Sequence, residues 1–218
     1  MPGAVPRLYL VTDRHATAGR PLAEVVRAAL AAVPLEARGA VVVQLREKDL
    51  PGRALFELAA ALREVTRAAG AALFVNDRVD VALAVGADGV HLGGRSLAPR
   101  DVARVAHGLA IASSTHTRAE VEVAARARAQ GADVRFAVFG PVWDTPSKRS
   151  YGRPVGVEAL REAAGVGLPV LALGGVTAAR VPACLEAGAS GVACIRAVLE
   201  ARDPGTAVQG LLRRWTES

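Results

Sequence analysis

The stretch "ALFVNDRVDVALAVGADGVHL", residues 72–92, contains a complete strand–helix–strand unit. Residues 72–76 and 89–92 form short runs that are apolar on both faces, as expected for strands that helices cover. Residues 78–86 place Val, Ala and Leu at helical spacing and end at Gly86, where a left-handed helix cap is expected. The stretch therefore predicts two successive strands joined by one helix.

The same alternation extends through the whole chain of 218 residues. Further strands are expected at 8–12, 40–45, 109–114, 135–140, 169–174 and 191–195, and further helices at 21–33, 52–69, 98–106, 118–130, 156–164, 178–188 and 205–215. Eight strand–helix units in this length predict an α/β fold, a single (β/α)8 TIM barrel in which residues 1–218 form one domain. A doubly wound open sheet is the alternative, but it rarely contains so many evenly spaced units of this size.

The composition indicates a protein with a large core and no membrane segment. Hydrophobic residues make up 51% of the chain, yet no apolar stretch reaches the length of a membrane span without charges. The amino terminus lacks the basic and apolar pattern of a secretory signal, which favours a cytoplasmic location. Cys184 and Cys194 lie in apolar surroundings and are too few for a disulfide framework, so we expect them to be buried. The oligomeric state stays open, with a homo-oligomer as one option.

The net charge of +6 raises the question of an anionic partner. The basic residues are spread along the chain and aromatic residues make up only 4%, so the sequence lacks the stacking surface that single-strand nucleic-acid binders use. We therefore expect no nucleic-acid partner, whereas small phosphorylated substrates fit a positive field. Of the 27 Lys and Arg residues only Lys48 and Lys148 are lysines, which suggests a specific use for their compact ammonium groups.

In a (β/α)8 barrel the reacting groups lie on the loops that follow the carboxyl ends of the strands. Alternation along an extended segment places Gln44, Arg46 and Lys48 on one side of the chain after the second strand. Each such residue alone has an ordinary explanation, for example helix capping, and it is their joint placement that indicates a site. The complete candidate set is Gln44, Arg46, Lys48, Asn76, Asp77, Ser114, His116, Thr145, Ser147, Lys148, Gly175 and Ile195.

The residue types in this set predict two anion sites and a metal ion. Cationic and hydroxyl side chains gather after the second and sixth strands, where a pyrophosphate group is expected. Asp77 offers a carboxylate suited to Mg2+, which proteins hold with one or two carboxylates and substrate phosphates. Gly175 and the backbone near Ile195 offer N–H groups after the seventh and eighth strands, a frequent site for a single phosphate. His116 could serve as a proton-transfer group, because histidine titrates near neutrality.

Taken together, these segments resemble the family of thiamine-phosphate synthases and their thiazole-tautomerase relatives. The resemblance starts at "LYLVTD" (8–13) and continues through "VQLREK" (43–48), "VNDRVDVALAVGADGVHLG" (75–93) and "FGPVWDTPSK" (139–148). It ends with "ALGGV" (172–176) and "AGASGVACI" (187–195) and so covers nearly the whole chain. The combination of the segment 76–93 with the "TPSK" loop is specific.

The resemblance implies a (β/α)8 barrel and an enzyme of thiamine biosynthesis. The enzyme would be a transferase that joins hydroxymethylpyrimidine diphosphate to hydroxyethylthiazole phosphate and releases pyrophosphate. The resemblance assigns the following roles: Gln44, Arg46, Lys48 and Asn76 to the pyrimidine diphosphate, Asp77 to Mg2+, Thr145, Ser147 and Lys148 to phosphate or pyrophosphate, and Gly175 with the backbone around Ile195 to the thiazole phosphate.

Two positions depart from the synthase pattern. A second metal aspartate is usual after the fourth strand, where this chain has Ser96, and Arg196 stands where a small hydroxyl residue is usual. The first change resembles the tautomerase branch, in which His116 would shift a proton on the thiazole ring. That branch tends to lose the residues that correspond to Asp77 and Lys48, which this chain keeps. The synthase is therefore the favoured hypothesis, and a thiazole tautomerase or a non-catalytic binder of thiazole or thiamine phosphates are the alternatives.

Overall fold

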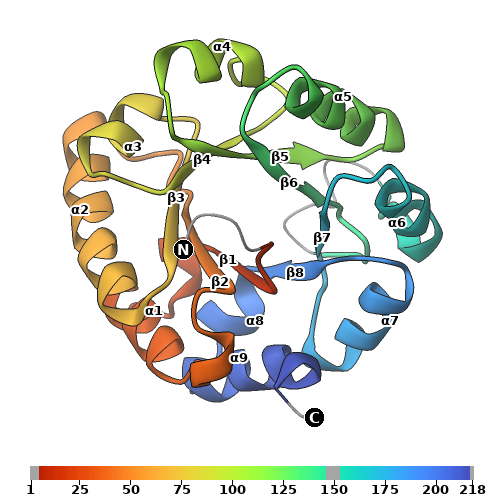
Figure 1. Cartoon of the computed structure of the whole chain (residues 1–218). Coiled ribbons are helices and arrows are strands. Elements are labelled where there is room, and N and C mark those ends of the chain that lie inside the picture. The colour runs from red at the N-terminus through yellow and green to blue at the C-terminus, as the bar shows by residue number, and fades with distance from the viewer. Residues whose placement is uncertain (1–4, 146–152, 217–218) are drawn as a thin grey trace.

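Parallel strands close into a barrel (Figure 1). The computed structural model describes residues 5–145 and 153–216. Each strand pairs with its neighbours in chain order, and β1 closes the barrel by pairing with β8. The predicted (β/α)8 barrel is confirmed, and an open sheet is excluded. The strands are β1 (Leu8–Val11), β2 (Val41–Leu45), β3 (Ala72–Asn76), β4 (Gly89–Leu92), β5 (Ala110–Thr115), β6 (Val134–Phe139), β7 (Val170–Leu173) and β8 (Gly191–Cys194).

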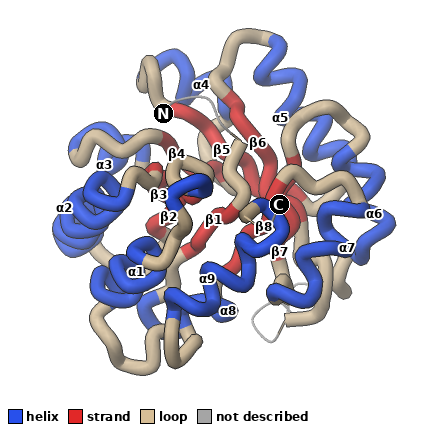
Figure 2. Tube along the Cα trace, turned by 60° about the horizontal axis from the view of Figure 1, so that its bottom comes forward, coloured by secondary structure: helices blue, strands red, loops and turns tan. Residues whose placement is uncertain are grey.

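Helices surround the barrel on its outer side (Figures 1 and 2). They are α1 (Leu22–Ala31), α2 (Gly52–Ala69), α3 (Val79–Ala84), α4 (Pro99–Val105), α5 (Arg118–Ala129), α6 (Gly156–Ala164), α7 (Val181–Glu186), α8 (Arg196–Leu199) and α9 (Pro204–Leu212). Helix α2 is capped by Gly70, whose φ of 68° is left-handed, and Gly86 after α3 has the positive φ of 61° that the sequence predicts. In the described parts of the chain, no helix combines the length and the apolar character needed to cross a membrane.

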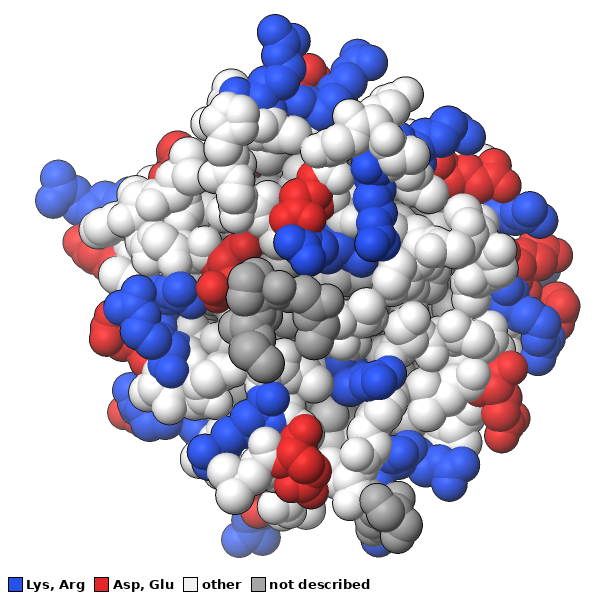
Figure 3. Space-filling model, in the orientation of Figure 1, with Lys and Arg blue, Asp and Glu red and all other residues white. Residues whose placement is uncertain are grey.

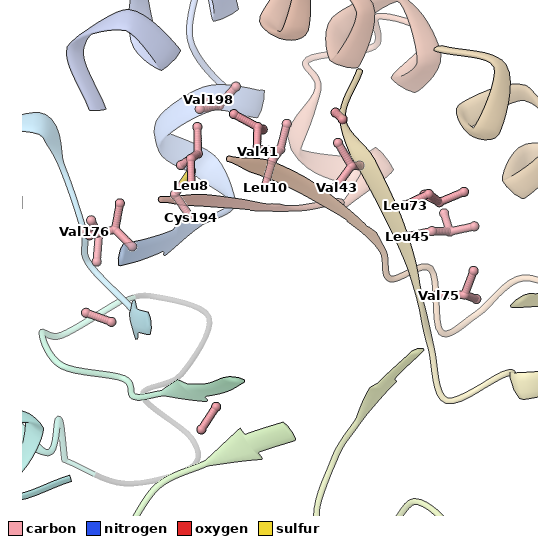
Figure 4. Close-up of a cluster of buried hydrophobic side chains, with 14 of the residues drawn as sticks. Leu8, Leu10, Val41, Val43, Leu45, Leu73, Val75, Val176, Cys194 and Val198 are labelled. Carbon is pink, nitrogen blue, oxygen red and sulfur yellow. The ribbon is translucent and has the colours of Figure 1, made fainter. Parts of the chain in front are cut away.

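Alternation along the strands separates two layers of side chains. Leu8 and Leu10 of β1 belong to the layer between strands and helices, where Figure 4 shows them beside other buried aliphatic residues. Tyr9 and Val11, at the intervening positions, belong to the cluster inside the barrel. Because Val11 pairs in register with Gln44, the Gln44 side chain also points inward, at the carboxyl end of β2. The first predicted site residue is therefore placed at the mouth of the barrel.

Aromatic rings fill the inside of the barrel below this mouth. Tyr9 is fully buried, and its ring centroid lies 5.3 Å from that of Phe136 and 6.1 Å from that of Phe74 in edge-to-face contacts. Gly89 makes room for this packing, since a Cβ atom there would lie 2.4 Å from the Phe74 ring and 2.6 Å from the Ala110 carbonyl oxygen. The interior is thus a packed core, which confines chemistry to the ends of the strands.

The last strand–helix unit differs from the prediction. The sequence predicted one helix at 205–215, whereas the structure has the short helix α8 directly after β8 and then α9. Helix α8 has only four residues, too few to leave a helical periodicity in the sequence. Helix α9 starts at Pro204, one residue before the predicted start. Asp203 caps it by accepting hydrogen bonds from the backbone N of Gly205 (2.9 Å) and of Thr206 (3.2 Å). Proline also suits the first position of a helix.

The face on which the chain enters β1 is turned toward the viewer in Figure 3. Basic and acidic side chains are interspersed around it, without a large area of one sign. Asp88, just before β4, pairs here with Arg63 at 2.6 Å and accepts a hydrogen bond from the backbone N of Leu73 at 2.8 Å. Contacts at this end of the strands stabilise the barrel, and the candidate site lies at the opposite end.

Candidate active site

A buried carboxylate fixes the loop that carries two of the predicted cations. The Glu47 side chain is 1% exposed, and it accepts hydrogen bonds from Thr12 Oγ1 at 2.7 Å and from the backbone N of Arg14 at 3.1 Å. Thr12 Oγ1 in turn accepts a hydrogen bond from the backbone N of Arg46 at 2.9 Å. Glu47 therefore links the ends of β1 and β2 and holds the backbone that presents Arg46 and Lys48.

Gln44, Asn76 and Asp77 form a row of hydrogen bonds across the ends of β2 and β3. Gln44 Nε2 donates to Asn76 Oδ1 at 3.1 Å, and Asn76 Nδ2 donates to Asp77 Oδ2 at 2.9 Å. Asp77 has a φ of 60°, a left-handed conformation that is uncommon for a residue other than glycine. The Asp77 side chain does not cap α3, so helix capping does not explain this strained backbone conformation. Strain of this kind is typical of functional positions.

The loop after β4 is attached to this row. Ser96 Oγ donates a hydrogen bond to Asp77 Oδ1 and accepts one from the backbone N of Gly93 at 2.6 Å. Each carboxylate oxygen of Asp77 thus accepts one hydrogen bond and keeps a free lone pair. Within residues 5–145 and 153–216, no group of three or more acidic, histidine or cysteine side chains could hold a metal ion. The single carboxylate fits an Mg2+ ion that takes its other ligands from water and substrate phosphates.

The positive charges of Arg46, Lys48 and Arg95 and the negative charge of Asp77 interact at this end of the barrel. Partial burial lowers the pKa of Lys48, the positive charges of Arg46 and Arg95 lower it further, and the negative charge of Asp77 raises it. Across the described residues, no salt bridge joins Arg46, Lys48 or Arg95 to an acidic side chain. One carboxylate therefore faces three cations, and the excess positive charge suits an anionic ligand.

A second row of hydrogen bonds runs from the barrel interior to the end of β5. The Tyr9 hydroxyl lies 3.0 Å from His91 Nδ1, and His91 Nε2 lies 2.7 Å from Ser114 Oγ. Since a buried hydroxyl proton needs an acceptor, we assign Tyr9 as the donor to Nδ1, so that Nε2–H donates to Ser114. The Ser114 proton is then free to point into the mouth, as a donor to an anion.

The burial of His91 should make the free energy of unfolding depend on pH. Burial lowers its pKa from 6.5 to about 3, so the folded protein keeps it neutral. Below pH 6.5 the unfolded chain binds a proton that the folded chain does not, and the free energy of unfolding falls as the pH falls toward 3. Between pH 7 and pH 5 we expect His91 to account for a loss of about 2 kcal/mol.

The loss can be measured by urea unfolding of wild type and His91→Gln at both pH values. Glutamine can still bond to Tyr9 and Ser114 but does not titrate, so the variant should lose less stability between pH 7 and pH 5 than wild type. His107→Gln is the matched control, because His107 is exposed. An unchanged pH dependence in His91→Gln would show that another group is responsible.

His116 is held at the junction of β5 and α5. Its ring Nδ1 donates to the Gly140 carbonyl oxygen, and its backbone N donates to Glu120, which also completes the capping box of α5 with Thr117. Nδ1 therefore carries the proton of the neutral ring, and Nε2 is the acceptor. These contacts give His116 a structural role at the rim, in addition to any contact with substrate.

The loops after β6 and β7 are in close contact. Gly174 and Gly175 have φ values of 96° and 67°, and a Cβ atom at Gly175 would lie 2.7 Å from Trp143 Cβ. Trp143 donates a backbone hydrogen bond to the Gly174 carbonyl at 3.0 Å. The Arg180 guanidinium lies 5.0 Å from the Trp143 ring and donates to the Gly175 carbonyl at 2.6 Å. Glycine is needed at 175 for its positive φ and for this close approach.

The remaining predicted residues lie at the ends of β6 and β8. Thr145 Oγ1 is buried and has no hydrogen-bond partner within the described segments, so it could take a ligand oxygen. Ser147 and Lys148 lie outside the described residues. Ile195 caps α8, directly after β8. Arg196, which departs from the synthase pattern, forms an ion pair with Glu200 at 3.0 Å along α8.

The structure thus places the described predicted residues at the carboxyl ends of the strands and joins several of them directly. Sequence reasoning missed the contacts of Glu47, Ser96 and His91. A signal was present for Glu47, which stands between the two predicted cations. The bonds of Ser96 and His91 connect different strands, and their spacing in the chain does not reveal them.

A sequence-family profile described as thiamine monophosphate synthase matches residues 8–198, which include all strands of the barrel. The chain belongs to the thiamine monophosphate synthase family. A family relative from Roseiflexus castenholzii, named thiamine-phosphate synthase, is 45% identical over 94% of this chain and 86% of its own length. A protein of Geobacter sulfurreducens is 50% identical over 94% of this chain and 92% of its own length.

A solved structure agrees with membership in the thiamine monophosphate synthase family. The thiamine phosphate pyrophosphorylase from Pyrococcus furiosus is 36% identical and superimposes with a TM-score of 0.80, covering 95% of this chain and 94% of its own. A 3-hexulose-6-phosphate synthase superimposes with a TM-score of 0.61 at 19% identity, which shows a shared fold alone.

Proposed function

We propose that the chain is a thiamine-phosphate synthase, which joins hydroxymethylpyrimidine diphosphate to hydroxyethylthiazole phosphate and releases pyrophosphate. Two observations carry this proposal. The positive charges of Arg46, Lys48 and Arg95 outnumber the one carboxylate of Asp77 at the carboxyl ends of the strands, with no salt bridge to these cations among the described residues, and the chain matches the family over residues 8–198. A site with excess positive charge and one carboxylate suits a diphosphate that brings Mg2+ with it. Thiazole tautomerisation has no comparable need for a diphosphate cradle.

The proposed roles follow the two rows of hydrogen bonds and the carboxyl ends of β6, β7 and β8. Gln44 and Asn76 orient the pyrimidine diphosphate, Arg46 and Lys48 bind its phosphates, and Asp77 is the ligand for Mg2+. Ser114 donates its free proton to a phosphate oxygen. The family resemblance assigns phosphate contacts to Thr145, Ser147 and Lys148 as well, and it assigns the thiazole phosphate to Gly175 and the backbone at Ile195.

The geometry supports a reaction in which charge separates. The bond between the pyrimidine methylene carbon and the diphosphate oxygen breaks, and negative charge builds on the leaving oxygens. Arg46 and Lys48 stabilise that charge, and Mg2+ would add Lewis-acid stabilisation of the same oxygens. The pyrimidine amino group delocalises the positive charge left on carbon, and the thiazole nitrogen then forms the new C–N bond. Little proton transfer is required, so no side chain needs to act as a strong base.

Substitution of His116 tests whether the chain is a synthase or a thiazole tautomerase. A positioned general base contributes about 100- to 10,000-fold to a proton shift. We expect His116→Ala to release pyrophosphate within about one order of magnitude of wild type, because ionisation and nitrogen attack need little base catalysis. We also expect wild type to isomerise thiazole phosphate only weakly.

Both activities can be measured on one sample, pyrophosphate release by a coupled absorbance assay and isomerisation by proton NMR of the thiazole. Wild type is the control for His116→Ala, incubated with both phosphorylated substrates and Mg2+. Rapid isomerisation without pyrophosphate release, lost in His116→Ala, would establish the tautomerase instead. Binding of the phosphates with neither activity would point to a non-catalytic binder.

Three further expectations accompany this proposal. Residues 1–218 act as one domain on small phosphorylated substrates, without a nucleic-acid partner. The enzyme works in the cytoplasm, which suits the free and buried state of Cys184 and Cys194. Its oligomeric state, with a homo-oligomer as one option, can be measured by light scattering.

A further inference from the structure

Arg95 is a cation of the mouth that has no assigned use. It lies in the loop between β4 and α4, next to Ser96, whose hydroxyl bonds Asp77 and the backbone N of Gly93. The backbone N of Ser96 also donates to the Gly93 carbonyl at 3.0 Å, so the turn 93–96 is closed and attached to Asp77. Arg95 is exposed, and its positive charge acts on Lys48. The turn thus places Arg95 directly next to the hydrogen bond between Ser96 and Asp77.

The charges of the neighbouring site residues indicate a role for Arg95. Arg46 and Lys48 bring two positive charges, and Asp77 offsets one of them. Ser96 contributes a hydroxyl and no charge, and its proton is already donated to Asp77. Among the residues that the structure describes, these groups therefore offer a diphosphate little net positive charge without Arg95. An arginine fork can bind two phosphate oxygens at once, which a lysine cannot do.

We propose that Arg95 binds the diphosphate of the pyrimidine substrate, as a third fixed cation with Arg46 and Lys48. The inference rests on the proposed function and adds a substrate-binding residue to it. In this arrangement part of the diphosphate charge is neutralised by the turn 93–96 and the remainder by the other cations and Mg2+. The protein should therefore bind a diphosphate measurably even when Mg2+ is removed.

Isothermal titration calorimetry with inorganic pyrophosphate tests this inference, first in EDTA and then in Mg2+. We expect wild type to bind in both conditions, and Arg95→Gln to bind about tenfold more weakly in EDTA, because it loses a charge-assisted contact. Arg95→Lys keeps the charge and loses the fork, so its affinity should fall between the two. Arg67→Gln is the matched control, since Arg67 is exposed in the last turn of α2, at the opposite end of the barrel.

Two results would overturn the inference about Arg95. One is equal pyrophosphate affinity of wild type and Arg95→Gln in EDTA, and the other is no binding by wild type until Mg2+ is added. The proposed function fails on a different result, namely the absence of pyrophosphate release when wild type receives both phosphorylated substrates and Mg2+. If the protein releases pyrophosphate and its Arg95→Gln variant binds pyrophosphate normally, the proposed function stands and only the role of Arg95 is wrong.

Discussion

Lys48→Ala is expected to lower kcat about 100-fold while KM changes much less. The charge on the leaving diphosphate grows as its bond to carbon breaks, so the ammonium group of Lys48 interacts more strongly with the transition state than with the substrate. Removal of one preorganised group that stabilises developing negative charge typically costs about 3 kcal/mol of activation free energy. Partial burial lowers the pKa of Lys48, the charges of Arg46 and Arg95 lower it further, and a bound diphosphate would offset the repulsion between these cations.

Steady-state kinetics with Mg2+ and both substrates give kcat and KM separately. Lys48→Met is the control for shape, and it should resemble Lys48→Ala, whereas Lys48→Arg should keep more activity. The resemblance assigns Lys148 a similar role, so Lys148→Ala should behave in the same way. If Lys48→Ala raised KM and left kcat unchanged, Lys48 would be a binding group that does not stabilise the transition state.

Glu47→Ala is expected to lower the free energy of unfolding by about 3 kcal/mol. The variant leaves the Thr12 hydroxyl and the backbone N of Arg14 without their acceptor in a buried place, and it removes the ion pair of Glu47 with the Arg14 guanidinium at 3.2 Å. A buried donor left without its acceptor typically costs about 1–3 kcal/mol, and two donors are affected here. The Arg14 guanidinium is not left unpaired, because it keeps its ion pair with Asp49 at 2.6 Å. Because Thr12 also orients the backbone N of Arg46, diphosphate binding should weaken as well.

Urea unfolding at pH 7 gives the stability change, and pyrophosphate titration gives the change in affinity. Glu64→Ala is the matched control, because Glu64 is 77% exposed and lies 3.8 Å from Arg67 in a pair of the kind that contributes about 0.5 kcal/mol or less. Glu47→Gln keeps the shape and some acceptor capacity, so it should fall between wild type and Glu47→Ala. Wild-type stability in Glu47→Ala would show that the ends of β1 and β2 are held by other contacts.

The fold could be predicted from sequence because its signals are local. Apolar runs such as 8–12 and 72–76 became β1 and β3 nearly residue for residue, since a short run with two apolar faces has few other places in a folded chain. Gly70 and Gly86 mark helix ends because their positive φ is a property of one residue and its neighbours. Helix α8 could not be predicted in this way, because four residues do not complete two turns.

The position of the candidate site residues in the barrel could be predicted, but the hydrogen bonds between them could not. A barrel brings the carboxyl ends of all strands to one face. Once the strands are assigned, Gln44, Asn76 and Asp77 are therefore expected at the same end of the barrel. The hydrogen bonds that join them and the left-handed backbone of Asp77 are seen only in the folded structure. The sequence also showed that Ser96 stands where an acid is usual, but not that its hydroxyl would bond to Asp77.

The sequence by itself determined the alternation of strands and helices, the burial of alternate side chains and the retention of Lys48 and Asp77, because each of these depends on residue type and spacing along the chain. Only the tertiary structure decided that Glu47 anchors the loop after β2, that His91 joins Tyr9 to Ser114, and that Ser96 bonds to Asp77. These contacts link residues on different strands and loops. Their energies depend on distance and burial in space, which residue spacing does not encode.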